Sequence, residues 1–185
     1  MTDHERRHHN AICLLELFPT FRARILGIID CLEEQGLRPR IREAWRSREE
    51  QLRRFKSGHT RLKFGLHNLT GKNGAKEALA VHLLDDDAPD VPSLRFLLML
   101  AAAARRNGCR TGILTGLPED AQADIVAAID RNSFDAPVQV GRAPTYVAPL
   151  GITVPEARYG KRPGPGMIGA NSDYKLYRLS GVNLG

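Results

Sequence analysis

Two neighbouring stretches carry the most informative motifs of the sequence: EAWRSREEQLRRFKSGHTRLKFGLHN at residues 43–68 and GAKEALAVHLLDD at residues 74–86. Residues 39–44 lead into the first stretch and alternate along the chain. Ile41 and Glu43 share one side of this segment and two arginines occupy the other, which predicts a strand that feeds a loop. The alternation places Glu43 on the same side of the strand as Ile41.

A capped helix is predicted to follow this strand. Ser47 precedes Glu50 by the spacing of a capping box, which predicts a helix over residues 48–56. Several glycines make residues 59–76 loop-like, and the small apolar residues of 77–84 are typical of a buried strand.

The rest of the chain adds further helices and strands. Its apolar spacing predicts helices over residues 21–35, 94–107 and 118–131, and strands over residues 110–114, 137–140 and 145–147. These elements predict an α+β domain, in which helices pack around a small, mostly antiparallel sheet.

The two ends of the chain differ in character from the middle. Residues 1–10 are polar and rich in histidine, which predicts a flexible N-terminus. Residues 11–157 would form the folded domain. Glycine and proline crowd the start of residues 158–185, which predicts a flexible or extended C-terminal tail.

The composition is typical of one soluble globular domain. The chain has 185 residues, of which 42% are hydrophobic and 26% charged. The apolar run at residues 96–104 is too short to span a bilayer, and the N-terminus MTDHERRHHN lacks the pattern of a signal peptide. We therefore expect synthesis in the cytoplasm and no membrane partner. Cys13, Cys31 and Cys109 form no CxxC pair, so we expect free thiols and no zinc ribbon.

The net charge of +6 bears on possible partners. A basic surface can meet nucleic acid or the anionic polymers of a cell wall, and it can equally be a solvated surface without such a partner. No groove-reading motif is present and aromatic residues make up 6% of the chain, which argues against a nucleic-acid-binding protein. An anionic polymer remains a candidate partner.

Two histidines are the first candidates for chemistry. The glycine-rich loop presents His67, and the predicted buried strand carries His82. Imidazoles from a loop and a strand can converge on one metal ion. The spacing by itself is equally compatible with two hydrogen-bonded histidines of a protein core.

Several short motifs carry a resemblance to a known family. They are WRS at residues 45–47 with Gln51 after it, GLHN at residues 65–68 and ALAV at residues 78–81. In this order they resemble the D-alanyl-D-alanine carboxypeptidase and L-alanyl-D-glutamate endopeptidase family, the LAS-type zinc peptidases of bacteria and phage endolysins. VGRAPTYV at residues 140–147 resembles the closing element of that family. The resemblance extends over roughly residues 18–157, and it implies a LAS-like fold.

The resemblance implies a metal site that has been altered. His67 matches the first metal ligand of the family. His82 stands where the family has an aspartate ligand, and Tyr146 stands where it has the third ligand, a histidine. Ala143 occupies the position of the catalytic carboxylate. The resemblance also implies substrate-binding roles for Arg46, Ser47 and Gln51, with Arg46 binding a substrate carboxylate or carbonyl; Arg46 could equally be a structural residue.

These substitutions have predictable chemical effects. Zinc, the cofactor implied if any is bound, accepts His67 and His82 readily, whereas a phenol such as Tyr146 must first lose a proton of high pKa. A zinc peptidase also needs a base for the metal-bound water, and Ala143 cannot supply one. The acidic run at residues 85–87 could substitute, although carboxylates after a strand are commonly solvated turn residues.

Two functional hypotheses follow. The favoured one is a degenerate, non-catalytic peptidase-like domain that binds a peptidoglycan peptide or a protein partner, in a phage or phage-derived particle. The alternative is an active zinc-dependent peptidoglycan peptidase, a carboxypeptidase or endopeptidase, whose ligand set is His67 and His82 with either Tyr146 or an aspartate.

Overall fold

Four strands form one antiparallel sheet in the computed structural model, which describes residues 1–71, 73–112, 123 and 145–151. The strands are β1 (Pro39–Glu43), β2 (Val81–Asp85), β3 (Cys109–Thr111) and β4 (Tyr146–Pro149), in the order β1-β2-β4-β3. The helices are α1 (Asp3–Leu14), α2 (Pro19–Glu34), α3 (Arg48–Lys56) and α4 (Leu94–Arg106), and a 3₁₀ turn, η1, spans Leu66–Asn68. The predicted α+β class is therefore confirmed, with every described strand pair antiparallel.

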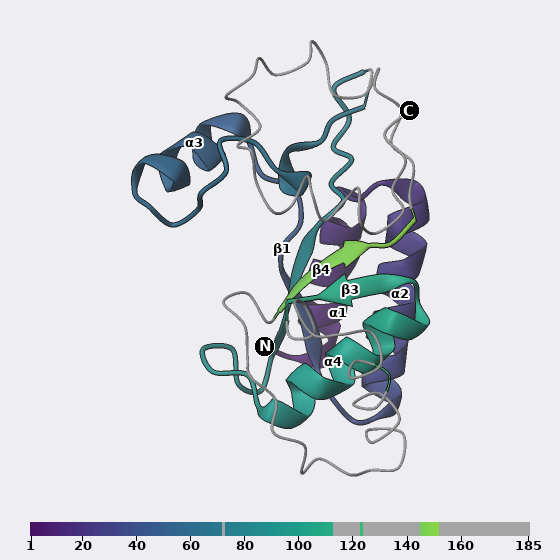
Figure 1. The fold of residues 1–185 in the computed structure, drawn as a ribbon. Helices are drawn as coiled ribbons and strands as arrows, with labels where there is room; N and C mark the ends of the chain where they lie inside the picture. The colour runs from purple at the N-terminus through teal and green to yellow at the C-terminus, as the bar shows by residue number, and fades with distance from the viewer. Residues whose placement is uncertain (72, 113–122, 124–144, 152–185) are drawn as a thin grey trace.

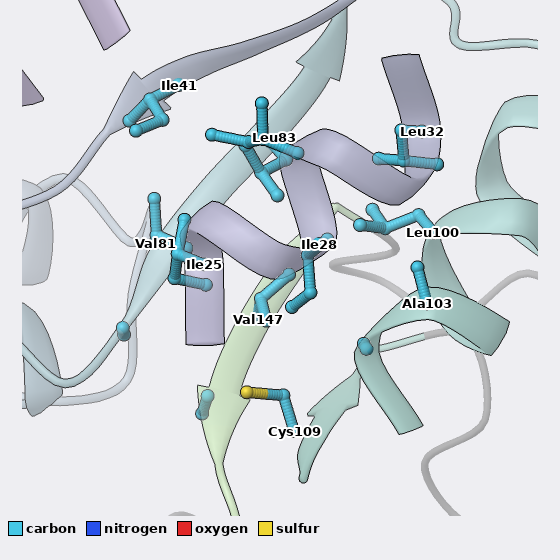
Figure 2. Close-up of a cluster of buried hydrophobic side chains, with 14 of the residues drawn as sticks. Ile25, Ile28, Leu32, Ile41, Val81, Leu83, Leu100, Ala103, Cys109 and Val147 are labelled. Atoms are coloured by element: carbon cyan, nitrogen blue, oxygen red, sulfur yellow. The ribbon is translucent and has the colours of Figure 1, made fainter. Parts of the chain in front are cut away.

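The hydrophobic core lies between one face of the sheet and the helices α2 and α4. Figure 2 shows side chains of α2, including Ile25 and Ile28, close to Val81 of β2 and Val147 of β4. All four of these side chains are fully buried. Figure 1 shows α3 standing apart from the helices that cover this face.

Helices α2 and α4 form where apolar spacing predicts them. In α2 the buried positions recur at helical intervals and give one apolar stripe, and they are Phe21, Ile25, Ile28, Ile29 and Leu32. In α4 the side chains from Phe96 to Ala104 are all buried. The expected helices at 21–35 and 94–107 are thus confirmed, with ends shifted by one or two residues.

The N-terminus differs from its prediction. Residues 1–10 are not a flexible extension, because α1 begins at Asp3 and its Thr2 and Glu5 form a capping box. The side chain of Asn10 explains why so polar a segment is ordered. Its amide nitrogen donates to the Pro39 carbonyl at 2.9 Å, and its oxygen accepts from the Ile41 amide at 2.8 Å. Polar side chains of α1 thus satisfy backbone groups along the edge of β1.

Hydroxyl caps begin α3 and α4 as expected. Ser47 Oγ accepts from the Glu50 amide at 3.2 Å, and Ser93 Oγ accepts from the Phe96 amide at 3.1 Å. The helix predicted at 48–56 has those bounds in the structure. Glu50 does not complete a capping box; its carboxylate accepts hydrogen bonds from Arg53 and Arg54 instead.

The strand predicted over residues 77–84 is present as β2, which is shorter than predicted and begins later in the chain. The amides of Ala78 and Leu79 bind the carbonyls of Glu16 and Leu66, so this segment joins loops before it joins the sheet. The helix predicted at 118–131, apart from Ala123, the strand predicted at 137–140 and the tail predicted at 158–185 lie outside the described residues. Among the described helices, none combines the length and hydropathy that a bilayer span requires.

Candidate metal centre

Three side chains form a row across neighbouring strands, at the end of β1 and near the starts of β2 and β4. His82 of β2 pairs with Glu43 of β1 on one side and with Tyr146 of β4 on the other. Directly opposite residues in an antiparallel sheet point to the same face. Since Val81 and Val147 face the helices (Figure 2), the alternation of side chains directs His82 and Tyr146 to the opposite face.

A β-bulge brings Glu43 into this row. Ile41 pairs with Leu83, but Glu43 rather than Arg42 pairs with His82. The extra residue in β1 reverses the alternation and turns Glu43 away from the buried side chain of Ile41. The prediction that Glu43 and Ile41 share a side is therefore wrong, because an alternation cannot reveal an inserted residue.

His67 reaches the same place from η1. The backbone nitrogen of Arg46 donates to the His67 carbonyl at 2.9 Å, and the side chain of Asn68 donates to the Arg46 carbonyl at 2.8 Å. These bonds tie η1 to the segment that leaves β1. His67 is therefore held in position by contacts between η1 and the segment that follows β1.

The three aromatic rings of the candidate site lie side by side. The ring centroids of His67 and His82 are 5.2 Å apart, with the ring planes 3° from parallel. The Tyr146 ring meets both imidazoles edge to face, at 5.9 Å from His67 and 5.6 Å from His82. The residues at all three expected ligand positions thus lie together, although they come from separate parts of the chain.

The hydrogen bond of His67 selects its tautomer. Its Nδ1 lies 2.6 Å from the Ala44 carbonyl oxygen, which can only accept, so Nδ1 carries the proton. Nε2 then has a free lone pair; it is buried and has no hydrogen-bond partner among the residues that the structure describes. Burial of an unpaired nitrogen costs free energy. In a metal-binding histidine, the ring nitrogen that does not bind the metal usually donates to a carbonyl or carboxylate.

Both imidazoles are held neutral. Burial, with a smaller contribution from the nearby His82, lowers the pKa of His67 to about 3. Burial likewise lowers the pKa of His82 to about 4, against the opposing effect of Glu43. Neutral imidazole is the form that binds metal.

Glu43 is ionised at neutral pH. Burial raises its pKa, but the hydrogen bonds and charge of Arg46 outweigh burial and hold the pKa at about 2. Arg46 Nε donates to Oε1 at 2.7 Å and Nη2 to Oε2 at 2.5 Å. Counted over the described residues, the site therefore contains two neutral imidazoles and one carboxylate, with a guanidinium beside it.

This set of donors fits a metal ion. One ligand atom each from Glu43, His67 and His82 lies within 4.8 Å of the others. A tetrahedral zinc with bonds of about 2.0–2.1 Å holds its ligand atoms roughly 3.3 Å apart, so the side chains would need to close by about 1.5 Å at most. Two histidines and a glutamate are a known catalytic zinc set, and they also suit ferrous iron.

The residues for which substrate binding is implied hold the site together. Arg46 Nη1 donates to Gln51 Oε1 at 2.5 Å, and Gln51 Nε2 donates to the Leu62 carbonyl at 2.6 Å. The Ser47 hydroxyl caps α3. These contacts fit a structural role for Arg46 rather than substrate binding, because its side chain is buried and binds Glu43 and Gln51.

Among the described residues, the acidic run at residues 85–87 does not belong to the cluster. Ala143 lies outside the described residues. Asp86 and Asp87 bind arginines: Asp86 contacts Arg40 at 2.7 Å, and Asp87 accepts from Arg38 at 2.6 Å. Asp85 Oδ1 accepts from the Asp87 amide at 3.2 Å, so this acidic run caps a turn beyond the end of β2.

Glu43 is the site residue that the sequence prediction missed. One signal was available: the alternation gave a carboxylate the same side as the apolar Ile41. A lone carboxylate on a core-facing side conflicts with the cost of burying charge. Such a conflict marks the alternation as wrong at Glu43, although it does not identify an inserted residue as the cause.

Comparison with known protein families gives no match for the chain, and comparison with curated proteins gives no significant match. The candidate site is therefore described by its own geometry.

Proposed function

We propose that this chain binds one divalent transition-metal ion through Glu43, His67 and His82, with zinc as the first candidate. The observation that carries the proposal is the buried Nε2 atom of His67, which has a free lone pair and no hydrogen-bond partner within the described part of the chain. A second imidazole and a carboxylate lie beside it. Tyr146 borders the same site and could approach the metal as a further oxygen ligand. The metal would supply charge and an open coordination position for a bound molecule.

We further propose a LAS-type peptidase ancestry. The motif resemblance suggests it, and it is supported by the convergence of His67, His82 and Tyr146, which occupy the three ligand positions that the resemblance implies. The motifs by themselves do not require residues so far apart in the sequence to lie together.

In this proposal the domain is a non-catalytic binding module. Hydrolysis by a metal-bound water needs metal ligands and, in addition, a base. Among the described residues, the cluster contains a single carboxylate, Glu43, which cannot serve as both ligand and base. The open position would then bind a wall peptide or a protein partner. A place in a phage or phage-derived particle rests on the resemblance alone.

The second candidate is an active zinc peptidase that acts on peptidoglycan peptides. One observation favours it: a carboxylate is present in the site, where the motifs had indicated none. If Tyr146 completed the ligand set, Glu43 could act as the base. The two candidates therefore differ in the role of Glu43 and in whether peptide bonds are cleaved.

Zinc titration of the untagged protein tests the proposed site. We expect one zinc per chain, and the variants His67→Ala, His82→Ala and Glu43→Gln should each weaken binding by about 100-fold or more. The control His59→Ala changes an exposed histidine and should bind as the wild type does. A wild-type protein that binds no zinc contradicts the proposal.

Peptidoglycan digestion separates the two candidates. The zinc-loaded protein should release no peptide fragments from purified peptidoglycan. Release of fragments that disappears in His67→Ala would establish the peptidase instead.

The proposed ancestry has its own test. The substitutions His82→Asp, Ala143→Asp and Tyr146→His together restore the residues of the family. That triple variant should bind zinc, and a folded triple variant without zinc would argue against the ancestry.

A further inference from the structure

Two arginines hold the carboxylate of Glu43. Arg46 binds it as a fork, from Nε to Oε1 at 2.7 Å and from Nη2 to Oε2 at 2.5 Å. Arg54 of α3 contacts the same two oxygens, with Nη1 3.1 Å from Oε2 and Nη2 3.1 Å from Oε1. An ionised carboxylate offers about four lone-pair positions, so these four contacts occupy them all.

A metal ion that binds Glu43 must therefore displace one of these contacts. Arg46 is the harder one to displace, because its side chain is 8% exposed and also donates to Gln51. The side chain of Arg54 is 38% exposed and makes longer contacts to Glu43. Arg54 also has a second partner, since its Nε donates to Glu50 Oε1 at 2.7 Å.

Charge points to the same exchange. With Arg46 in place, Arg54 and a metal ion would bring the cations on one largely buried carboxylate to three, and they would repel one another at such short separation. If Arg54 leaves as the metal enters, the carboxylate exchanges one cation for another and keeps Arg46. Glu50 can keep the released guanidinium at the edge of the site.

We propose that Arg54 takes the place of the metal beside Glu43 in the metal-free protein, and that metal entry displaces it toward Glu50. This inference rests on the proposed function, because it needs Glu43 to be a ligand. Its consequence is that Arg54 lowers the metal affinity of the site. Metal occupancy is then coupled to α3, the helix that carries Arg54.

Helix α3 offers a matched pair of variants. Arg54→Gln removes the cation that the metal would displace. Arg53→Gln removes the same charge from the preceding residue, whose side chain is 78% exposed and pairs with Glu50. The zinc dissociation constant is measured by competition with a chromophoric chelator. Arg54→Gln should bind zinc about tenfold more tightly than the wild type, and Arg53→Gln should stay within about threefold of it.

The nitrogen-bound protons of the arginine side chains, followed by NMR, give a readout on the wild-type protein. Addition of zinc should shift the guanidinium signals of Arg54 and leave those of Arg53 in place. Unchanged Arg54 signals at saturating zinc, or equal zinc affinities of Arg54→Gln and Arg53→Gln, would overturn the inference while the metal site stands. A wild type that takes up no zinc would instead overturn the proposed function.

Discussion

His67 depends on one hydrogen bond for its suitability as a ligand. The Ala44 carbonyl fixes the proton on Nδ1, at a separation of 2.6 Å, and so leaves Nε2 as a lone-pair donor. Ala44 follows β1 directly, so the sheet itself sets the tautomer. A histidine oriented in this way needs no rearrangement of its proton before it binds a metal ion.

Gln51 is the buried link between Arg46 and the loop before η1. Gln51→Ala leaves Arg46 Nη1 and the Leu62 carbonyl without this partner, and we expect the free energy of unfolding to fall by about 1–3 kcal/mol. Urea denaturation measures it. Gln35→Ala, which changes an exposed glutamine, should have little effect. A Gln51→Ala protein as stable as the wild type would show that the link carries no energy.

At the residue scale, the sequence predicts what local chemistry controls. The capping role of Ser47 follows from its spacing to the next helix, and His67 stands out in a glycine-rich loop. Glu43 could not be predicted in the same way, because its direction depends on a bulge in the pairing of β1 with β2. The packing of the sheet determines that pairing, and the sequence of β1 alone does not specify it.

Hydroxyl caps at the starts of α3 and α4 give the clearest prediction at the scale of elements. Ser47→Ala and Ser93→Ala each remove the acceptor of a backbone amide, so each should lower the free energy of unfolding by about 1 kcal/mol. Thermal or urea denaturation provides the measurement. Ser57→Ala changes an exposed hydroxyl at the other end of α3 and should cost less than about 0.5 kcal/mol.

Two elements show what the sequence can and cannot predict. α2 follows from its apolar stripe alone. α1 could not be predicted in this way, because two of its three buried residues, Arg6 and Asn10, are polar. Their hydrogen-bond partners lie on other elements. Arg6 Nη1 donates to Glu33 of α2 at 2.6 Å and to the Pro39 carbonyl at 3.1 Å. Polarity indicates exposure only where no such partners are in reach.

At the scale of the whole molecule, the antiparallel sheet joins the residues of the site. Three of its strands bring Glu43, His82 and Tyr146 into one row, and the loop between β1 and β2 adds His67. The class of fold could be predicted from the number and type of elements. The strand order could not, since it is set by long-range packing.

The metal-free protein should lose stability as the pH falls below neutrality. Unfolded histidine binds a proton near pH 6.5, whereas the pKa is about 3 for His67 and about 4 for His82 in the folded protein. The unfolded state therefore binds more protons between these values, and stability that is complete above about pH 7 declines toward pH 4. Each proton contributes a slope of at most about 1.4 kcal/mol per pH unit.

Urea denaturation at a series of pH values measures this decline. His82→Gln should flatten the decline between pH 6.5 and pH 4, and the exposed-site control His59→Gln should leave it unchanged. A free energy of unfolding that stays level across this range would mean that the two imidazoles are not held neutral.

The proposed metal site is defined by its three ligands, Glu43, His67 and His82. X-ray absorption spectroscopy at the zinc edge of the loaded, untagged protein identifies this ligand set, because sulfur scatters differently from nitrogen and oxygen, and imidazole rings add a characteristic outer-shell signal. We predict one zinc per chain with two imidazole ligands, the remaining ligands oxygen, and bonds of about 2.0–2.2 Å. Sulfur at about 2.3 Å, which would place the zinc on a cysteine, or a spectrum with no imidazole scattering, would contradict the account.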